Sequence, residues 1–536
     1  MPRVIFDWDK KYNKGIILSD YLEDIRAHFS TPNPAAKILE RKYGASSFIQ
    51  QRLHVITNTG RFDPGLYFDI IKFLKASTID YEIVTTDLFY DNILCGVITE
   101  DFVIDPLGLE LRDFQETSIY SGLKFGYGVF QIGTGGGKTY LMAMLERSFR
   151  TLHKEEFKTL IALPAQLVHQ TYKDFVEYGV PADSICKWSG KQALEDKPII
   201  IASYKTLHAK INSFKHMKPK KRDDKDSNEN PLFTTNAEYQ AYLKEFIDRA
   251  RVREKAWNKR KKEYLKELES VDLLMLDEVH FLRKHNKLNK LIGYFKTRHR
   301  YGFTGTLPED MIDSWNIIGK IGPLIENVSS YELRQRKYLA NAKVSVIKIT
   351  YVDPPDIKPD HEKPTKAYNE ECDFVYNNKF RNNVIAHVCK QAKNNTLIMV
   401  DRIEHGKLLF EHIEAKAPNK KVYWVCGEVA MEEREKIRAL MEKEDNIICI
   451  AITRIFSTGI NIKNLHYVVF AQSGKAKITM VQSIGRGLRL NDNKELLIIV
   501  DIADDLRYGN DHLIKRLKRY GLEQIEYEIK ELREST

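Results

Sequence analysis

Residues 129–149 of the chain read VFQIGTGGGKTYLMAMLERSF. This stretch opens with a short strand-like run, continues through the glycine-rich loop GTGGGKT at 133–139, and ends in a segment with helical spacing of apolar residues. A strand, a glycine loop with Lys and Thr, and a helix in this order are typical of a phosphate-binding P-loop. The segment therefore predicts a strand and a helix joined by a loop that binds nucleotide phosphates at the amino end of the helix.

Each residue type in the loop suits this chemistry. The glycines let backbone N–H groups close around phosphate oxygens, because no side chain intervenes. Lys138 supplies a point charge to the β and γ phosphates, and Thr139 is a candidate ligand of Mg²⁺. ATP and Mg²⁺ are therefore the predicted cofactors. The candidate nucleotide-binding residues here are Thr134, Gly135, Gly136, Gly137, Lys138 and Thr139.

From about residue 106 onward, short apolar runs alternate with longer stretches of helical period. This alternation is typical of parallel sheets covered by helices. The runs form two series, separated near 319–332 by Gly, Pro, Ser and Asn with little periodicity, so two similar sheets are predicted. The first series is 129–132, 159–164, 199–203, 273–277 and 301–306; the second is 344–351, 396–401, 421–426, 446–452, 466–471 and 497–502.

Two carboxylates, Asp277 and Glu278, follow the apolar run LLML. Active sites of α/β sheets lie at the carboxyl ends of the strands, so this position suits catalysis. We expect Asp277 to hold Mg²⁺, directly or through water, and Glu278 to orient and deprotonate the attacking water. The tetrapeptide DEVH alone is common as an exposed acidic turn. Its place downstream of the P-loop, on a strand of its own, favours the catalytic interpretation.

The order of these motifs resembles that of the superfamily 2 helicases of the DExH type. The strict P-loop pattern wants Gly where Ile132 stands, and the loop matches the helicase variant x-x-T-G-x-G-K-T. LRDFQ is similar to the segment in which Gln115 contacts the adenine edge, and FTGTL at 303–307 to the motif that couples hydrolysis to domain movement. Further similar segments are 162–170, 202–207, 452–465 and 482–490.

The last of these segments, QSIGRGLRL, places Gln482, Arg486 and Arg489 at helical spacing. Arginines supplied across a cleft stabilise charge on a transferring phosphoryl group, so we expect the second sheet to close on the first. Gln482, Arg486 and Arg489 are therefore candidate catalytic residues together with Lys138. Gly459, in the preceding motif, is a further candidate for ATP binding.

A narrower resemblance lies in the second half of the chain. VYWVCGEVAMEER (422–434), the stretch 456–489, and DIADDL with LKRYGLEQI (501–525) are similar to the UvsW-type bacteriophage DNA helicases. Members of that family are ATP-driven enzymes that remodel branched DNA. The resemblance implies an ATP-dependent DNA helicase or translocase that acts on D-loops, R-loops, forks or junctions in phage-type recombination and replication repair.

Three other functions stay open. One is a double-strand DNA translocase subunit of a restriction or defence complex. A second is an RNA helicase, because motifs that contact the sugar-phosphate backbone do not show whether the sugar is that of DNA or RNA. A third is a nucleotide-gated nucleic-acid clamp, which the intact Lys138, Glu278, Arg486 and Arg489 disfavour. The predicted partners are DNA, and RNA in hybrids.

No membrane partner is expected, because no apolar run approaches the roughly 20 residues of a membrane span. Six scattered cysteines and the lack of a signal peptide in the first residues predict a reduced, cytoplasmic location, the host cell cytoplasm if the gene is a phage gene.

The predicted organisation has four parts. Residues 1–105 form a small α/β accessory domain, a candidate DNA-binding domain with a helix at 66–76; 106–325 and 326–505 form two RecA-like domains; 506–536 form a basic helical tail. A charged insertion at about 208–268 interrupts the first RecA-like domain. Residues 211–270 hold sixteen basic and eleven acidic side chains, and this excess of five positive charges is half of the net charge of +10. We interpret the insertion as a solvated charged helix or hairpin, a DNA contact, or a docking site for a protein partner.

Overall fold

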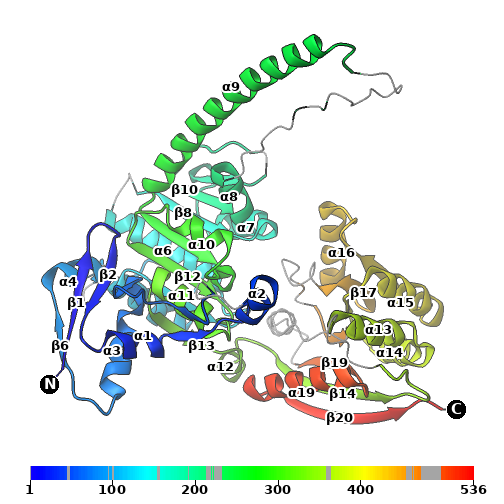
Figure 1. The fold of residues 1–536 in the computed structure, drawn as a ribbon. Helices are drawn as coiled ribbons and strands as arrows, with labels where there is room; N and C mark the ends of the chain where they lie inside the picture. Colours follow the sequence, from blue (N-terminus) through cyan, green and yellow to red (C-terminus); the bar gives the residue numbers. More distant parts are fainter. Residues whose placement is uncertain are drawn as a thin grey trace. The chain divides into compact units, whose positions relative to one another are not determined.

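The structure is a computed structural model of the 536-residue chain (Figure 1). It describes all residues except 1, 45–48, 95, 99–101, 154–156, 191, 213–218, 220, 222–231, 358–363, 454–461, 463, 473–495 and 536. Contacts divide the chain into two compact units. The first comprises Met1–Phe130, Tyr140–Phe303 and Leu307–Ile325; the second comprises Gln131–Thr139, Thr304–Thr306 and Glu326–Thr536.

The amino-terminal part of the first unit is a small α/β fold, as predicted. Its four-stranded sheet has the order β5-β2-β1-β6, and β3 pairs with β4 in a separate ribbon. Trp315 of α11 belongs to its apolar core, so this part packs directly on the first large sheet's helical layer. The elements are β1 Arg3–Asp9, β2 Lys14–Leu18, α1 Leu22–His28, β3 Ser30–Pro32, α2 Ala36–Tyr43, β4 Arg52–His54, β5 Arg61–Phe62, α3 Tyr67–Ala76, β6 Glu82–Thr85 and α4 Asp87–Ile93.

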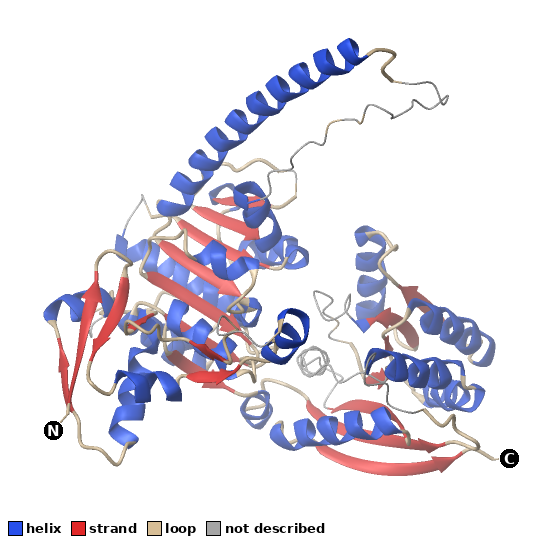
Figure 2. Ribbon diagram, in the orientation of Figure 1, coloured by secondary structure: helices blue, strands red, loops and turns tan. Residues whose placement is uncertain are grey.

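The first large sheet has seven strands in the order β13-β7-β12-β11-β8-β10-β9. Its inner strands β8, β10 and β11 are buried along their whole length, because helices cover both faces (Figure 2). The strands are β7 Gly128–Ile132, β8 Thr159–Leu163, β9 Ile185–Trp188, β10 Ile199–Ser203, β11 Leu273–Asp277, β12 His299–Thr304 and β13 Leu324–Val328. The helices are α5 Asp113–Phe125, α6 Lys138–His153, α7 Val168–Glu177, α8 Tyr204–Asn212, α10 Lys287–Ile292 and α11 Met311–Ile321. Helix α12 Ser330–Gln335 belongs to the second unit.

The second large sheet also has seven strands, in the order β16-β17-β15-β18-β19-β14-β20, and its pairings are parallel. The strands are β14 Asn341–Thr350, β15 Thr396–Val400, β16 Lys421–Val425, β17 Ile447–Ile452, β18 Tyr467–Phe470, β19 Leu496–Asp504 and β20 Glu526–Arg533. The helices are α13 Pro364–Asn377, α14 Lys379–Gln391, α15 Ile403–Lys416, α16 Met431–Lys443 and α19 Arg507–Leu522. Two parallel sheets flanked by helices confirm the predicted pair of RecA-like folds.

The charged insertion contains one long helix, α9 Asn236–Glu269, which extends away from the first large sheet (Figure 1). Thr235 and Glu238 form a capping box at its start. Its last turns anchor it: Leu268 is buried in the core of the sheet, and Glu267 pairs with Lys158 at 2.6 Å. Most of the helix is exposed, which fits the predicted solvated charged helix and leaves a partner for it as a prediction.

Three strands of the large sheets were not predicted: β9, β13 and β20. Each lies at the edge of its sheet. The predicted helical tail, 506–536, is helical only over α19; its last part was wrongly predicted, because it forms strand β20, which pairs with β14 and is exposed along its whole length. Among the described helices, none is long and apolar enough to cross a membrane.

Candidate active site

The P-loop connects β7 to α6. Gly135 and Gly137 have φ values of +87° and +82°, in the left-handed region that favours glycine. A Cβ on Gly136 would lie 2.4 Å from the side chain of Ile132, so a larger residue does not fit there. The N–H of Gly136 donates to the carbonyl of Gly133 at 3.0 Å and closes the turn. The backbone is therefore wound so tightly that only glycine suits it.

Lys138 is the first residue of α6, and its ammonium folds back over the loop. Its Nζ donates to the carbonyl of Ile132, the last residue of β7, at 3.0 Å. Thr139, next along the helix, is half-buried. The amino end of a helix carries partial positive charge and unpaired N–H groups, which attract anions. The glycine loop, the amino end of the helix and the ammonium of Lys138 together suit the phosphates of a nucleoside triphosphate.

The FTGTL segment lies against the same loop. A Cβ on Gly305 would be 3.5 Å from Oγ1 of Thr134, which is an ordinary van der Waals distance. The hydroxyl of Thr304 donates to the carbonyl of Thr306 at 2.9 Å and holds the segment in a turn. The structure thus brings a predicted coupling motif next to a predicted nucleotide-binding residue.

The two carboxylates stand at the carboxyl end of β11, as predicted. Asp277 is buried, and its Oδ1 accepts the backbone N–H of Glu278 at 2.9 Å. Glu278 adopts a φ of +54°, which is uncommon for a residue with a side chain and costs conformational energy. Its Oε2 lies 3.2 Å from Nδ1 of His280, a buried residue. The acidic turn is therefore strained and held from two sides.

Tyr204 also contacts the acidic turn, although it was not among the site residues predicted from the sequence. Its hydroxyl donates to the main-chain carbonyl of Asp277. Burial, reinforced by the charges of Asp277 and Glu278, raises the pKa of Tyr204 well above its ordinary value, so it stays a proton donor. It opens α8 directly after β10, and β8 lies between β10 and β11 in the sheet. An aromatic residue straight after a strand in ASYKTL was the only available signal.

Gln115 is buried at the start of α5, where its side-chain oxygen accepts the backbone N–H of Arg112 at 3.0 Å. This contact stabilises the helix end. Its predicted contact with adenine stays a prediction. Gly459, Gln482, Arg486 and Arg489 lie outside the described residues, so their predicted roles also stay predictions.

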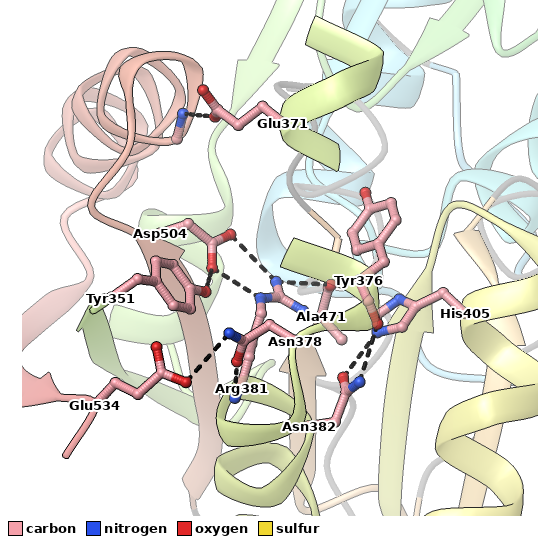
Figure 3. A network of polar contacts seen from close by, with 11 residues as sticks. Tyr351, Glu371, Tyr376, Asn378, Arg381, Asn382, His405, Ala471, Asp504 and Glu534 are labelled. Atoms are coloured by element: carbon pink, nitrogen blue, oxygen red, sulfur yellow. Dashed lines mark hydrogen bonds and ion pairs between the residues drawn. The ribbon is translucent and has the colours of Figure 1, made fainter. Parts of the chain in front are cut away.

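The second large sheet carries two carboxylates as well, Asp501 and Asp504 of β19. Asp504 accepts the guanidinium of the buried Arg381 at 2.8 Å and the hydroxyl of Tyr351 at 2.6 Å (Figure 3). Asp501 accepts Arg516 and Tyr520, each at 2.8 Å. Burial opposes the charged form of Arg381, but the negative charge of Asp504 outweighs it and raises the pKa of the guanidinium. These carboxylates hold the fold together.

Comparison with known proteins gives the same picture of two motor domains. A family model described as the res subunit of type III restriction enzymes matches residues 108–309, and one for the helicase conserved C-terminal domain matches residues 379–491. The chain is 26% identical over 442 residues to the ATP-dependent DNA helicase UvsW of Enterobacteria phage T4, which covers 79% of this chain and 77% of that protein. The chain is a superfamily 2 helicase.

Two other relatives agree with this family. A putative helicase of a Sulfolobus islandicus filamentous virus is 24% identical over 86% of the helicase and 73% of its own length. A fragment of a putative HsdR subunit of a type I restriction enzyme from Vibrio vulnificus shares the fold, with a TM-score of 0.53 at 16% identity over 84% of the helicase and 75% of that chain. The helicase is therefore a nucleic-acid-dependent ATPase, similar to the UvsW helicases.

Proposed function

We propose that this helicase remodels branched DNA, such as D-loops, R-loops, forks or junctions, in phage-type recombination and repair. The observation that carries the proposal is the similarity to the DNA helicase of phage T4, which extends over 79% of the chain. The glycine cradle and the strained carboxylate turn support it, because both parts of an ATPase site are present on the first large sheet.

In this proposal each residue has one task. The backbone of the P-loop and the ammonium of Lys138 hold the phosphates of ATP, whose hydrolysis supplies the free energy for movement. Asp277 and Thr139 would hold Mg²⁺, which neutralises phosphate charge; Mg²⁺ binds through one or two protein ligands together with phosphates. Glu278 accepts the proton of the attacking water, while Tyr204 and His280 keep the turn in place.

The proposal extends to residues of the other motifs. Gln115 contacts the adenine, and Gly459 lines the ATP site. Arg486 and Arg489, with Gln482, stabilise the transferring phosphoryl group from the second RecA-like domain. Alternation between two nucleotide states then moves the two domains along nucleic acid.

The test measures ATPase and strand displacement side by side on a forked DNA, a D-loop, an R-loop and a plain duplex. We expect displacement on the branched substrates and much less on the duplex. Glu278→Gln is the matched control, because it keeps the fold and removes the base. Strong ATPase without displacement on any branched substrate would contradict the proposal.

A second candidate function is a double-strand DNA translocase of a restriction or defence complex. It is favoured by the family model for the res subunit of type III restriction enzymes and by the shared fold with an HsdR fragment. A translocase displaces a third strand from a triplex without separating the duplex beneath it. Displacement of a triplex strand together with intact forks and D-loops would favour this second function.

We also propose that α9 contacts DNA rather than a protein. Its stretch 249–262 holds eight basic side chains and one acidic one, and the aromatic Trp257 lies among them. Each phosphate neutralised contributes about −0.9 to the slope of log affinity against log salt on duplex DNA. Replacing 232–263 by a short Gly-Ser bridge should flatten that slope by about two to four units. An unchanged slope and affinity would leave a protein partner or a solvated helix.

A further inference from the structure

A cavity of about 710 Å³ lies between the accessory domain and the first large sheet, inside the first unit. Its walls come from the turn between β1 and β2, the segment after β5, and the ends of α4 and α11. The connection from α10 to β12 closes the remaining side. Six cationic side chains line it: Lys10, Lys14, Lys296, Arg298, Arg300 and Lys320.

One carboxylate, Asp63, is found among the described residues that line this cavity. It lies 2.9 Å from Lys14 and 3.5 Å from Lys320, so a single negative charge is shared by two ammonium groups. Burial works against ionisation of Asp63, yet these two lysines together lower its pKa. The cavity therefore holds more positive charge than Asp63 can neutralise.

The arginines of the cavity are held by neutral acceptors. Arg300 donates to the backbone carbonyls of Thr297, Phe295 and Lys320. Arg298 donates to the carbonyl of Asp91 and the side-chain oxygen of Asn92. These contacts fix the guanidinium groups without cancelling their charge. They also join α4 of the accessory domain to β12.

One lysine that lines the cavity, Lys296, and one beside it, Lys284, have further contacts. Lys296 pairs at 2.7 Å with Glu269, the last residue of α9, and its side chain stays largely exposed. Lys284 donates to the carbonyl of His54. Burial, with the charges of Lys14 and Lys320, lowers the pKa of Lys284 to about 8 against the opposing effect of Asp63. Burial is the main cause of this lower pKa, and the charges of the two lysines add to it.

Aromatic side chains stand at the same cavity. Tyr12, in the turn between β1 and β2, is 49% exposed, and the guanidinium of Arg61 lies 4.1 Å from the centre of its ring. Trp8, at the end of β1, is half-buried and also lines the cavity. Cations together with aromatic rings are what proteins use to bind single strands, whose backbone pairs with the cations and whose bases stack on the rings.

The size of the cavity selects between forms of nucleic acid. A space of about 710 Å³ is too small to take in a duplex, which is wider than its own major groove of about 12 Å. We propose that this cavity binds a single strand of nucleic acid, with its phosphates against Lys10 and Lys296 and a base on Tyr12. The inference rests on the proposed function, because the strand that the accessory domain binds would be the single strand that a branched substrate exposes.

The experiment uses the full chain without ATP and a fluorescent oligothymidine of about 12 nucleotides, within the range of known single-strand sites. The variant Lys10→Gln with Lys296→Gln removes two exposed cations. Each phosphate contact on a single strand contributes about −0.7 to the salt slope, so the slope should flatten by about 1.4 and the affinity at 0.1 M salt fall roughly 5–25-fold. Lys10→Arg with Lys296→Arg should restore both.

Tyr12→Ala separates stacking from charge. It should weaken oligothymidine binding by roughly fivefold or more and leave the salt slope unchanged. The matched control is Lys72→Gln with Lys75→Gln, two exposed lysines of α3 that lie outside the cavity. This control should bind as the unaltered chain does. Thermal unfolding of every variant establishes that it is folded.

Three results would overturn the inference: unchanged affinity and slope in the cavity variant, an equal loss in the α3 control, or an equal loss of slope on a blunt duplex. The last would assign these lysines to duplex DNA. Failure of the proposed function looks different, because strand displacement would then be absent in the unaltered chain while oligothymidine binding still depended on the cavity.

Discussion

The two large sheets share a fold, and each carries two carboxylates on one strand or directly after it, but the two pairs have different partners. On the second sheet, Asp501 and Asp504 are 0% and 2% exposed, and each receives an arginine and a tyrosine hydroxyl. On the first sheet, Asp277 accepts a backbone N–H, and Glu278 sits in a strained turn beside His280.

We expect this difference to distinguish a structural carboxylate from a catalytic one in the same fold. When an arginine neutralises a buried carboxylate, removing that carboxylate leaves the arginine uncompensated and lowers the stability of the fold. A carboxylate held at a strained backbone position costs stability, and such strain gathers at functional sites. The partners of an acid, rather than its place on a strand, therefore indicate its role.

Among these variants, Glu278→Gln should have the largest effect on turnover. General base catalysis contributes about 10²–10⁴ in rate, so turnover of ATP should fall by that factor while ATP stays bound. The unfolding temperature should stay close to that of the unaltered chain, since glutamine keeps the volume of the side chain. Steady-state ATPase and nucleotide binding measure the two effects. Normal ATPase would remove Glu278 from the catalytic role.

The second sheet should respond to Asp504→Asn in the opposite way. Removing one partner of a buried ion pair leaves Arg381 uncompensated and costs about 3–5 kcal/mol. We therefore expect a lower unfolding temperature and a lower denaturant midpoint for the second unit. The folded fraction should retain nucleotide binding. A variant as stable as the unaltered chain would show that the Arg381–Asp504 pair is not what holds β19 to α14.

Several strands that the sequence predicted are buried along most or all of their length. VFQI, IIIAS and LLMLD are runs of apolar residues, and the structure places them as β7, β10 and β11. The three missed strands lie at sheet edges, where only one side pairs. β20, EYEIKELR, is exposed throughout, so its composition resembles that of a surface segment. β16 is also an edge strand, but its run KVYWV is apolar enough to have been predicted.

The candidate site divides in a similar way. The P-loop and the Asp277–Glu278 pair were predictable because their residues are neighbours in the chain, so that glycine spacing and adjacent acids after a buried strand reveal them directly. Tyr204 was not, because its contact with Asp277 depends on the order of β10, β8 and β11 in the sheet. Nor was the cavity of the accessory domain, whose cations lie as far apart in the chain as Lys10 and Lys320.

The smallest expected effects come from removing one hydroxyl on each sheet. Tyr520→Phe removes a donor to a buried carboxylate and should cost about 1.5–3 kcal/mol of stability with ATP turnover unchanged. Tyr204→Phe removes a donor to a neutral carbonyl and should cost only about 0.5–1.5 kcal/mol. Its turnover should nevertheless fall, because the Asp277–Glu278 peptide loses its support. Denaturant unfolding measures the stability of both variants, and an ATPase assay measures their turnover. Turnover that falls with Tyr520→Phe and not with Tyr204→Phe would contradict the roles assigned to the two sheets.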